Sequence, residues 1–369
     1  MNKTIAVATI IISLFSCSQK KQGEWKNIFP EEKWLISDPI DQGIDQIKMQ
    51  AALDYLESKS RHNGNKELII IRNGYMIFGG DQIDSTHNIW SCSKTFTSTV
   101  LGLLVDDGIF SLDQKASEYE PLLKEYYPDV TFRHFTTMTS GYSAVGESRW
   151  PTTNYADWSW TVYEPEEPYF DPGTAYAYWD EAQMMFGRVL TQVLKRPMQE
   201  FLKERVTDPI GMGEWNWYPE KDLGGIPINN GCTNVIVNAK QFARWGWLFL
   251  NMGNWDGNQL ISKEWVKMAT SVQVPSTLPM GETDRKETVG PGCYGFNWWI
   301  NGRKANGEMK LPGAPEGCYF ASGLNNNKCI VIPQWNMVVV RMGEDGHPDD
   351  KDVVYGTFLK MLGESIIDH

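Results

Sequence analysis

Histidines and metal-binding spacings are scarce in this chain. It has 369 residues, of which five are histidine, and no Cys-x-x-Cys or His-x-His spacing occurs. Structural zinc sites gather Cys and His ligands at short spacings, so the sequence predicts no metal site. A fixed-period repeat is also missing, which excludes solenoids and propellers. The length suits one large domain or two lobes.

Positive charge and cysteine are limited as well. Lys and Arg number 34 against 46 Asp and Glu, giving a net charge of −12 with no basic stripe. Such a chain repels nucleic acid, so nucleic-acid partners are not expected. Setting Cys17 aside leaves an odd number of cysteines, and at least one thiol is then free unless chains cross-link. If residues 324–327 form a hairpin turn, Cys318 and Cys329 lie far out of register, which predicts no disulfide between them.

The N-terminal apolar stretch is too short to span a membrane. It follows Lys3 and has the length of a signal-peptide core, so residues 1–16 are predicted to be a signal peptide. Its end, "LFSC", resembles a bacterial lipobox, which implies lipidation of Cys17 and a tether over residues 17–35. The protein is then expected at the periplasmic face of a bacterial membrane as a lipoprotein, with the lipid as its sole membrane contact. An ordinary secretory signal with an incidental cysteine, giving a soluble periplasmic or secreted protein, is the alternative.

Periodicity and turn residues divide the rest of the chain. Asn73-Gly74 between two β-rich runs predicts a hairpin over residues 67–81. The segment from about Ser91 to Gly108 is apolar on nearly all sides and predicts a buried central helix. Further helices are expected over residues 42–60, 134–142, 181–206 with a break near Pro197, 238–252, 262–271 and 351–366. Further strands are expected over residues 294–300, 317–323, 328–333 and 336–343.

This order of elements predicts an α/β (α+β) fold for residues 36–369. Strands joined by short turns pair antiparallel, so the first hairpin and the late strands can share one sheet, flanked by the N- and C-terminal helices. A helical lobe, about residues 110–225, is inserted into this α/β lobe. The cleft between the two lobes is the expected ligand site.

The segment "WSCSKTF" (90–96) places Ser91 three residues before Lys94, on one face of the helix start. A serine hydroxyl becomes a useful nucleophile when a nearby base takes its proton, and a buried lysine can be that base if its pKa falls. The spacing alone is weak, since Ser18 and Lys21 repeat it. The plain alternative is a helix-capping serine beside a solvated lysine. Because little else in "SCSKTFTSTVLGLLV" is charged, a lysine there favours a functional or paired role.

The segment "NIWSCSKTFTSTVLGLLVDDGIFSLDQKASEY" resembles the nucleophile region of the class C β-lactamase-like serine hydrolase superfamily. Other landmarks follow in the family's order: "TTMTSG" (136–141), "DPGTAYAYWDEAQMMFG" (171–187), "NAKQFARWGWLFLNMGNWDGNQLISKEWV" (238–266), "YGFNWW" (294–299) and "ASGLNNNKCIVIPQWNMVVVR" (321–341). The resemblance spans roughly residues 30–365. It implies a β-lactamase/transpeptidase-like fold, a nucleophilic Ser91 and a base at Lys94.

The family's second motif, Tyr-x-Asn, does not occur. Tyr178-Trp179-Asp180 stands at the family distance after Pro172-Gly173. The resemblance therefore implies that Tyr178 shares a proton with Lys94 and Ser91 and protonates the leaving group. The alternative for Tyr178 is a core aromatic. Asp180 replaces the family's Asn; we expect it either to pair with Lys94, which would weaken that base, or to meet a substrate amine.

The family's third motif, a cation two residues before a glycine on a strand, maps onto Ala321-Ser322-Gly323. The cation is missing, because Ala321 stands in its place. By the resemblance, the oxyanion hole consists of the backbone N–H groups of Ser91 and Leu324, which survive side-chain changes. Gly323 is expected where substrate approaches the strand closely. These three residues, with Trp179 and Asp180, are the expected substrate-binding residues.

Many of the sixteen tryptophans lie between Trp150 and Trp217. The segment "WPTTNYADWSWTVYEPEEPYF" (150–170) predicts a loop over the cleft, and the aromatic side chains of this loop are expected to select the acyl group of the substrate by apolar contact. Core packing of the helical lobe is the alternative.

These features predict an exported serine hydrolase that forms an acyl-enzyme on a small ester, amide or peptide-like substrate, with no metal or organic cofactor. The alanine at 321 and the acid at 180 favour substrates without a carboxylate near the scissile bond, with esterase or 6-aminohexanoate-dimer hydrolase-like activity leading. β-Lactamase or D-Ala-D-Ala carboxypeptidase activity, with a cation from Arg303 or Lys328, is one alternative. A catalytically impaired binding protein of the same fold is the other.

Overall fold

The computed structural model describes residues 27–60, 62, 64–145, 161–281, 288–344 and 351–367. The predicted signal peptide, Cys17 and most of the predicted tether lie outside these residues. So does the 150–160 part of the aromatic segment.

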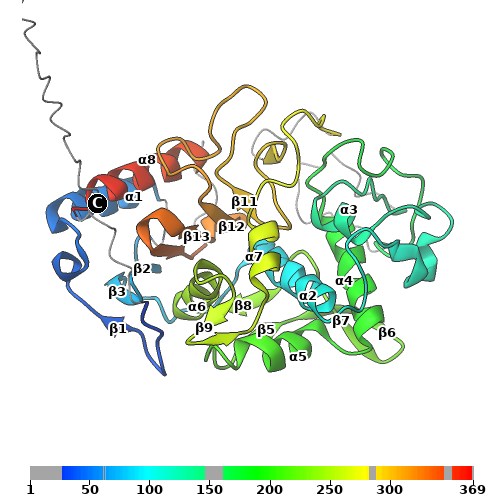
Figure 1. Cartoon of the computed structure of the whole chain (residues 1–369), viewed down its shortest axis with the longest axis horizontal. Coiled ribbons are helices and arrows are strands. Elements are labelled where there is room, and N and C mark those ends of the chain that lie inside the picture. The colour runs from blue at the N-terminus through cyan, green and yellow to red at the C-terminus, as the bar shows by residue number, and fades with distance from the viewer. Residues whose placement is uncertain are drawn as a thin grey trace, which may run out of the picture.

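A seven-stranded sheet forms the centre of one lobe, in the order β1-β3-β2-β14-β13-β12-β11 (Figure 1). All neighbours pair antiparallel except β1 and β3. Its strands are β1 (Leu35–Ile36), β2 (Leu68–Arg72), β3 (Tyr75–Gly79), β11 (Trp299–Ile300), β12 (Tyr319–Ser322), β13 (Lys328–Ile332) and β14 (Met337–Arg341). The prediction that the first hairpin shares a sheet with the late strands is confirmed. Asn73 and Gly74 both have positive φ, 54° and 89°, as a type I′ hairpin turn requires.

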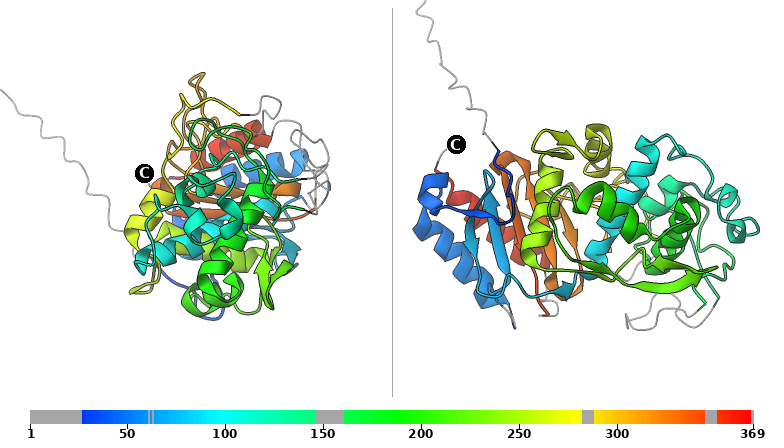
Figure 2. Two further views of the ribbon diagram at one scale, coloured as in Figure 1. Left: turned by 90° about the vertical axis from the view of Figure 1, so that its right-hand side faces the viewer. Right: turned by 90° about the horizontal axis from the view of Figure 1, so that it is seen from below.

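Helices cover both faces of this sheet, so its central strands are apolar throughout. On one face lie α1 (Gln46–Lys59) and α8 (Lys351–Glu364), packed against Ile70, Ile330 and Val339. The neighbouring strand residues point the other way, toward α6 (Ala239–Leu250) and α2 (Lys94–Asp106). The right panel of Figure 2 shows these layers from the α1/α8 pair at one end to the second lobe at the other.

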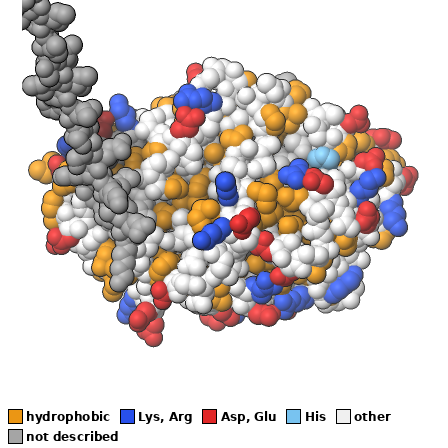
Figure 3. Space-filling view, in the orientation of Figure 1, with side chains coloured by type: hydrophobic (Ala, Val, Ile, Leu, Met, Phe, Trp, Pro, Cys, Tyr) orange, Lys and Arg blue, Asp and Glu red, His pale blue; other side chains and the backbone are white. Residues whose placement is uncertain are grey.

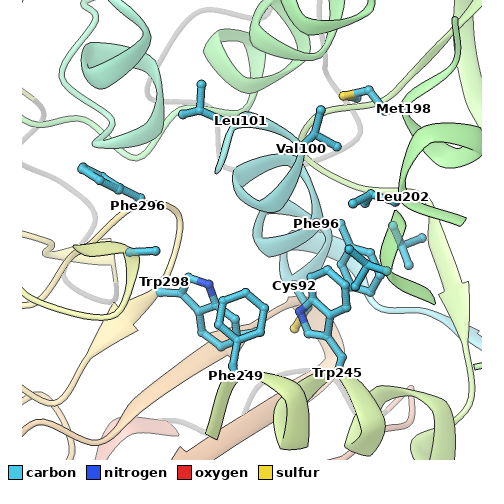
Figure 4. Close-up of a cluster of buried hydrophobic side chains, with 14 of the residues drawn as sticks. Cys92, Phe96, Val100, Leu101, Met198, Leu202, Trp245, Phe249, Phe296 and Trp298 are labelled. Atoms are coloured by element: carbon cyan, nitrogen blue, oxygen red, sulfur yellow. The ribbon is translucent and has the colours of Figure 1, made fainter. Parts of the chain in front are cut away.

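The predicted central helix is confirmed as α2, preceded by a 3-10 turn, η2 (Trp90–Ser93). Every residue from Lys94 to Leu104 is buried. Phe96 stacks on Trp245 of α6 with ring centroids 3.9 Å apart, and both side chains belong to the buried cluster shown in Figure 4. Gly108, at φ 70°, ends the segment. This packing fixes the N-terminus of α2, where Ser91 and Lys94 lie, against the sheet.

The second lobe combines short helices with small strands. Its helices are α3 (Phe132–Thr136), α4 (Asp180–Leu194) and α5 (Met198–Leu202), and a π-helical turn follows over Lys203–Thr207. Its strands are β5 (Asn216–Trp217), β6 (Pro219–Leu223) and β7 (Ile226–Asn229). The other elements are β4 (His87–Asn88), β8 (Val235–Val237), β9 (Asn254–Trp255), β10 (Asn258–Gln259), α7 (Lys263–Ala269), and 3-10 turns over Pro39–Gln42, Ala116–Glu118, Pro121–Leu123, Leu324–Asn326 and Pro333–Trp335. The break near Pro197 is confirmed.

Three expectations need correction. The helix over residues 134–142 is wrong, because α3 ends at Thr136 and Gly141 instead makes a close backbone approach to the Phe170 carbonyl. The strand over 294–300 keeps only its last two residues, since Asn297, at φ 58°, turns the chain. The β12–β13 register differs by one residue from the predicted one, so Cys329 faces Ala321. Cys318 and Cys329 are both free and buried.

Candidate active site

A cleft with an empty volume of about 670 Å³ lies between the two lobes. Six of the residues expected to form the site line it: Ser91, Tyr178, Asp180, Ser322, Gly323 and Leu324. They come from η2, the start of α4 and the end of β12. Lys94 lies directly behind Ser91, with 1 % of its surface exposed. Segments more than two hundred residues apart in the sequence thus meet at one place.

The backbone before Ser91 is held in an uncommon conformation. Trp90 has φ 50°, a region that non-glycine residues seldom occupy and that stores about 1–3 kcal/mol of strain. Its N–H donates to Asn88 Oδ1 at 2.8 Å, and the same oxygen accepts from Asn234 N at 3.2 Å. The side chain of Asn88 therefore braces the turn that presents Ser91 to the cleft.

The Lys94 ammonium group donates hydrogen bonds to three oxygen atoms. Its Nζ lies 2.8 Å from Ser91 Oγ, 2.7 Å from Asp180 Oδ1 and 3.3 Å from the Cys232 carbonyl oxygen. The pairing of Asp180 with Lys94 is thus confirmed. Burial has the largest single effect on the pKa of Lys94 and lowers it, but Asp180, Tyr178 and Cys232 together outweigh burial and leave the pKa well above its usual value. Lys94 is therefore charged in this resting state.

Tyr178 completes this group on the side of the second lobe. Its ring lies 4.7 Å from Lys94 Nζ and stacks on Trp299 with centroids 5.4 Å apart. Burial raises the pKa of Tyr178 to about 12, although the charge of Lys94 and hydrogen bonds with Ser91 and Lys94 act in the opposite direction. The hydroxyl therefore carries its proton at neutral pH.

Asp180 is the first residue of α4, and the helix dipole there favours a negative charge. Its side chain is 16 % exposed, so the ion pair with Lys94 is largely shielded from water. A carboxylate only accepts hydrogen bonds, and this one accepts from Lys94.

A close backbone contact requires glycine at position 323, and this reason is separate from the expected approach of substrate. A Cβ at this position would lie 2.2 Å from the Ile89 carbonyl oxygen, so glycine permits the end of β12 to pack against the backbone just before Ser91. In the described part of the chain, neither the Ser91 N–H nor the Leu324 N–H donates to a protein acceptor. Both residues line the cleft.

Two of the expected substrate-binding residues do not line this cleft. Along the extended segment before α4, side chains alternate, so Tyr178 and Asp180 point into the cleft while Ala177 and Trp179 line a second pocket of about 540 Å³. Ala321, 1 % exposed, likewise points to the opposite face of the sheet from Ser322. Trp179 and Ala321 are therefore separated from the cleft by the backbone that carries them.

The two candidate cations for the third motif lie in different places. Arg303 is 56 % exposed and pairs with Glu316, outside the cleft lining. Lys328 is buried, and its Nζ donates to Ser322 Oγ at 2.8 Å.

Some contributors to the site carry no sequence signal. Cys232 contacts Lys94 through its backbone carbonyl oxygen, which any residue type could supply. Asn88 contributes indirectly, because its side chain accepts from the Trp90 N–H and holds the turn before Ser91. Lys310, which also lines the cleft and pairs with Asp352 at 3.0 Å, lies in a loop of ordinary composition. These contacts become visible through tertiary structure alone.

Among the described residues, no group of three or more His, Cys, Asp or Glu is placed to hold a metal ion. Within the same residues, no helix has the length and hydropathy needed to cross a membrane. Over the face seen in Figure 3, basic side chains are interspersed with acidic ones and form no stripe.

Comparison with known proteins agrees with this geometry. The family model described as Beta-lactamase matches residues 80–359. The D-alanyl-D-alanine-carboxypeptidase/endopeptidase AmpH of Escherichia coli is 22 % identical over 237 residues, covering 57 % of this chain and 61 % of that protein.

Solved structures share the fold at low identity. A protein provisionally named a 6-aminohexanoate-dimer hydrolase from Bacillus anthracis has a TM-score of 0.65 at 18 % identity, covering 90 % of this chain and 88 % of that one. A family VIII carboxylesterase also has a TM-score of 0.65, at 16 % identity, covering 91 % of this chain and 100 % of that one. The chain therefore belongs to the Beta-lactamase family, within the class C β-lactamase-like superfamily of serine hydrolases.

Proposed function

We propose that this protein is an exported hydrolase that cleaves an ester or amide through an acyl-enzyme on Ser91. The observation that carries the proposal is the 2.8 Å contact between Lys94 Nζ and Ser91 Oγ at the edge of the cleft. A nucleophile and a base within hydrogen-bond distance, the base held by a third group, is the arrangement that activates a serine. Asp180 is the group that holds Lys94 in place, while its negative charge also keeps Lys94 protonated in the resting state.

The proposed chemistry begins with loss of a proton from Lys94. Neutral Lys94 then takes the Ser91 proton as Oγ attacks the substrate carbonyl carbon. The N–H groups of Ser91 and Leu324 stabilise the resulting oxyanion. Tyr178 gives its proton to the leaving oxygen or nitrogen and regains one through Lys94. Water, deprotonated by the same pair, then attacks the acyl carbon, and the pair returns this proton to Ser91 Oγ as the bond between Oγ and the acyl carbon breaks.

In the proposed reaction, Gly323 keeps the Leu324 N–H beside the Ser91 N–H. In Gly323→Ala the new methyl group would collide with the Ile89 carbonyl and push Leu324 away from Ser91. We expect kcat to fall by about 10²–10³, the loss typical of one missing oxyanion donor, with a smaller change in KM. Steady-state kinetics on a chromogenic ester measure this. An unchanged kcat would show that this strand does not set the oxyanion hole.

Export is the finer part of the proposal. It rests on the apolar segment after Lys3 and on Cys17, which would carry the lipid that holds the enzyme at the membrane. A soluble periplasmic or secreted protein is the alternative. Metabolic labelling with a fatty-acid probe, compared between the natural chain and Cys17→Ala, separates the two.

Esters lead among the substrates, with amide dimers next. The pairing of Lys328 with Ser322 favours a second candidate, β-lactamase or D-Ala-D-Ala carboxypeptidase activity, since it supplies a cation close to the position where Ala321 lacks one. Turnover of p-nitrophenyl esters, 6-aminohexanoate dimer, nitrocefin and a D-Ala-D-Ala peptide by the purified protein tests both. If the natural chain turns over none of these substrates above the rate of Ser91→Ala, the result points instead to the impaired binding protein.

A further inference from the structure

Large aliphatic side chains are exposed together at one end of the molecule. Twelve large hydrophobic residues of the described chain are exposed, and five of them form this group: Leu35, Ile36, Ile40, Ile47 and Ile367. Ile47 and Ile36 are the most exposed of the twelve, at 84 % and 77 %. Single exposed apolar residues are ordinary, whereas a group of them marks an interaction surface. We call these five residues the apolar end.

One part of the apolar end surrounds the turn between β2 and β3. β1 carries Leu35 and Ile36 and pairs with β3 directly after this turn. The Asn73 side chain of the turn donates to Gln42 Oε1 at 3.1 Å, and Gln42 ends the 3-10 turn that contains Ile40. These three aliphatic residues are therefore held around one hairpin turn.

The other part lies where α1 begins and α8 ends. Ile47 is in the first turn of α1, and Ile367 follows the end of α8. The Ile367 N–H donates to the carbonyl oxygen of Gly43, which caps the 3-10 turn of the first part. This contact joins the two parts into one surface. In Figures 1 and 2, β1 and the α1/α8 pair lie away from the second lobe, and hydrophobic side chains are visible at that end in Figure 3.

The apolar end and the cleft lie at opposite ends of the same elements. Lys351 and Asp352, the first residues of α8, line the cleft, whereas the last turn of α8 adjoins the apolar end. The 14 residues of α8, at 1.5 Å each, separate the two by about 20 Å. The strand register agrees, because Ser322 of the cleft is in line with Leu68 at the start of β2, and the hairpin turn follows the end of β2.

The N-terminal segment enters the fold at the apolar end. The Ile28 N–H donates to the Asn73 carbonyl oxygen in the hairpin turn. Ten residues, 17–26, lead from the proposed lipid at Cys17 to Asn27. Even a fully extended chain of this length spans at most about 35 Å. A lipid on Cys17 therefore keeps the apolar end close to the bilayer, where its effective concentration at the lipid surface is high.

The surroundings of the apolar end favour lipid over a second copy of the protein. β1 is an edge strand, but its length of two residues offers another chain few backbone groups for pairing. Residues 31–48 include five acidic and two basic side chains, so two copies of this end repel each other. The same charge disfavours anionic lipid and favours a zwitterionic surface.

We infer that the apolar end inserts its aliphatic side chains into the surface of the lipid bilayer and holds the cleft about 20 Å from the lipid. The inference rests on the lipid anchor of the proposed function and goes beyond it, because the sequence made that lipid the sole membrane contact. A covalent lipid fixes one point of the molecule, whereas a second contact also fixes its orientation. Held in this way, the cleft takes its substrate from the aqueous phase.

Single introduced cysteines test the contact, because the five cysteines of the described chain are all free and buried. Ile36→Cys, Ile47→Cys and the control Leu122→Cys, an exposed leucine of the second lobe, are labelled in the full chain with the polarity-sensitive dye NBD. The natural chain, treated alike, gives the background from Cys17. On phosphatidylcholine vesicles we expect blue-shifted emission and about threefold or more weaker quenching by aqueous iodide at the first two positions, with no change at the control.

Serine substitutions measure the contribution of the side chains themselves. In the full chain carrying Cys17→Ala, where no lipid masks the effect, Ile36→Ser/Ile47→Ser is expected to lower partitioning onto phosphatidylcholine vesicles about tenfold. The matched control, Ile109→Ser/Leu122→Ser, removes two exposed aliphatic side chains elsewhere and should leave partitioning unchanged. Both double variants should keep kcat and KM on a soluble ester, since none of these residues lines the cleft.

Three results would overturn the contact. The first is quenching at positions 36 and 47 that vesicles do not change. The second is equal partitioning of the two double-serine variants. The third is protection that arises without vesicles and grows with protein concentration, which would assign the surface to a second copy. Failure of the lipid anchor looks different: the fatty-acid probe would not label the natural chain, yet dyes at 36 and 47 would still enter the vesicles. Failure of the hydrolase function alters neither readout.

Discussion

Replacing Ser91 with alanine is expected to lower kcat on any accepted ester by about 10⁴–10⁶, because loss of the nucleophile of a serine hydrolase removes the covalent route entirely. The structure gives the reason for choosing this serine. Its Oγ accepts from Lys94 Nζ at 2.8 Å and lines the cleft. Initial rates at saturating ester, corrected for spontaneous hydrolysis, measure the loss.

Ser98→Ala is the matched control for this change. Ser98 lies on the same helix, is fully buried, and its hydroxyl has no hydrogen-bond partner in the described structure. Removing an unpaired buried hydroxyl leaves folding and activity close to those of the natural chain. If Ser91→Ala retained the activity of Ser98→Ala, another residue would be the nucleophile.

Replacing Asp180 with asparagine is expected to increase activity at neutral pH. Burial has the largest effect on the pKa of Lys94 and lowers it, whereas Asp180 is the largest of the contributions that raise it and leave the pKa well above its usual value. Without that charge burial dominates, so the pKa of Lys94 falls and more of the lysine is neutral at a given pH. Each unit of decrease raises the neutral fraction, and with it kcat/KM below the pKa, about tenfold. The rising limb of the pH–rate profile should move to lower pH.

The pH dependence of kcat/KM from pH 5 to pH 10 measures this shift. Asp180→Glu, which keeps the charge, is the control and should not move the limb to lower pH. A loss of activity in Asp180→Asn at every pH would contradict the role assigned to the ion pair. It would mean that Asp180 takes part in the reaction, for instance by binding a substrate amine.

Local sequence signals predicted the framework of the fold well. The Asn73-Gly74 turn has a conformation that these residue types favour, and the apolar run after Ser91 could be satisfied only by burial on all sides. Both predictions depend on neighbours in the chain. The placement of Tyr178 beside Lys94 came instead from the spacing shared with the superfamily, and the structure brings the two side chains together.

The features of the site that the sequence did not predict depend on tertiary contacts. Trp179 adjoins Tyr178 in sequence yet lines a different pocket, because side chains alternate along the extended segment. Gly323 is needed for contact with the backbone at Ile89, which is distant in sequence. The contact of Lys328 with Ser322 depends on the hairpin register, and the one-residue difference from the expected register places Lys328 opposite Ser322.

Labelling of the folded protein with a fluorophosphonate, followed by peptide mass mapping, tests the central claim most directly. The reagent phosphonylates a serine only when that serine is activated as a nucleophile. The account predicts one adduct, on the peptide that contains Ser91, present in Ser98→Ala and missing in Ser91→Ala. No adduct on the folded natural chain, or an adduct on a different serine, would contradict it.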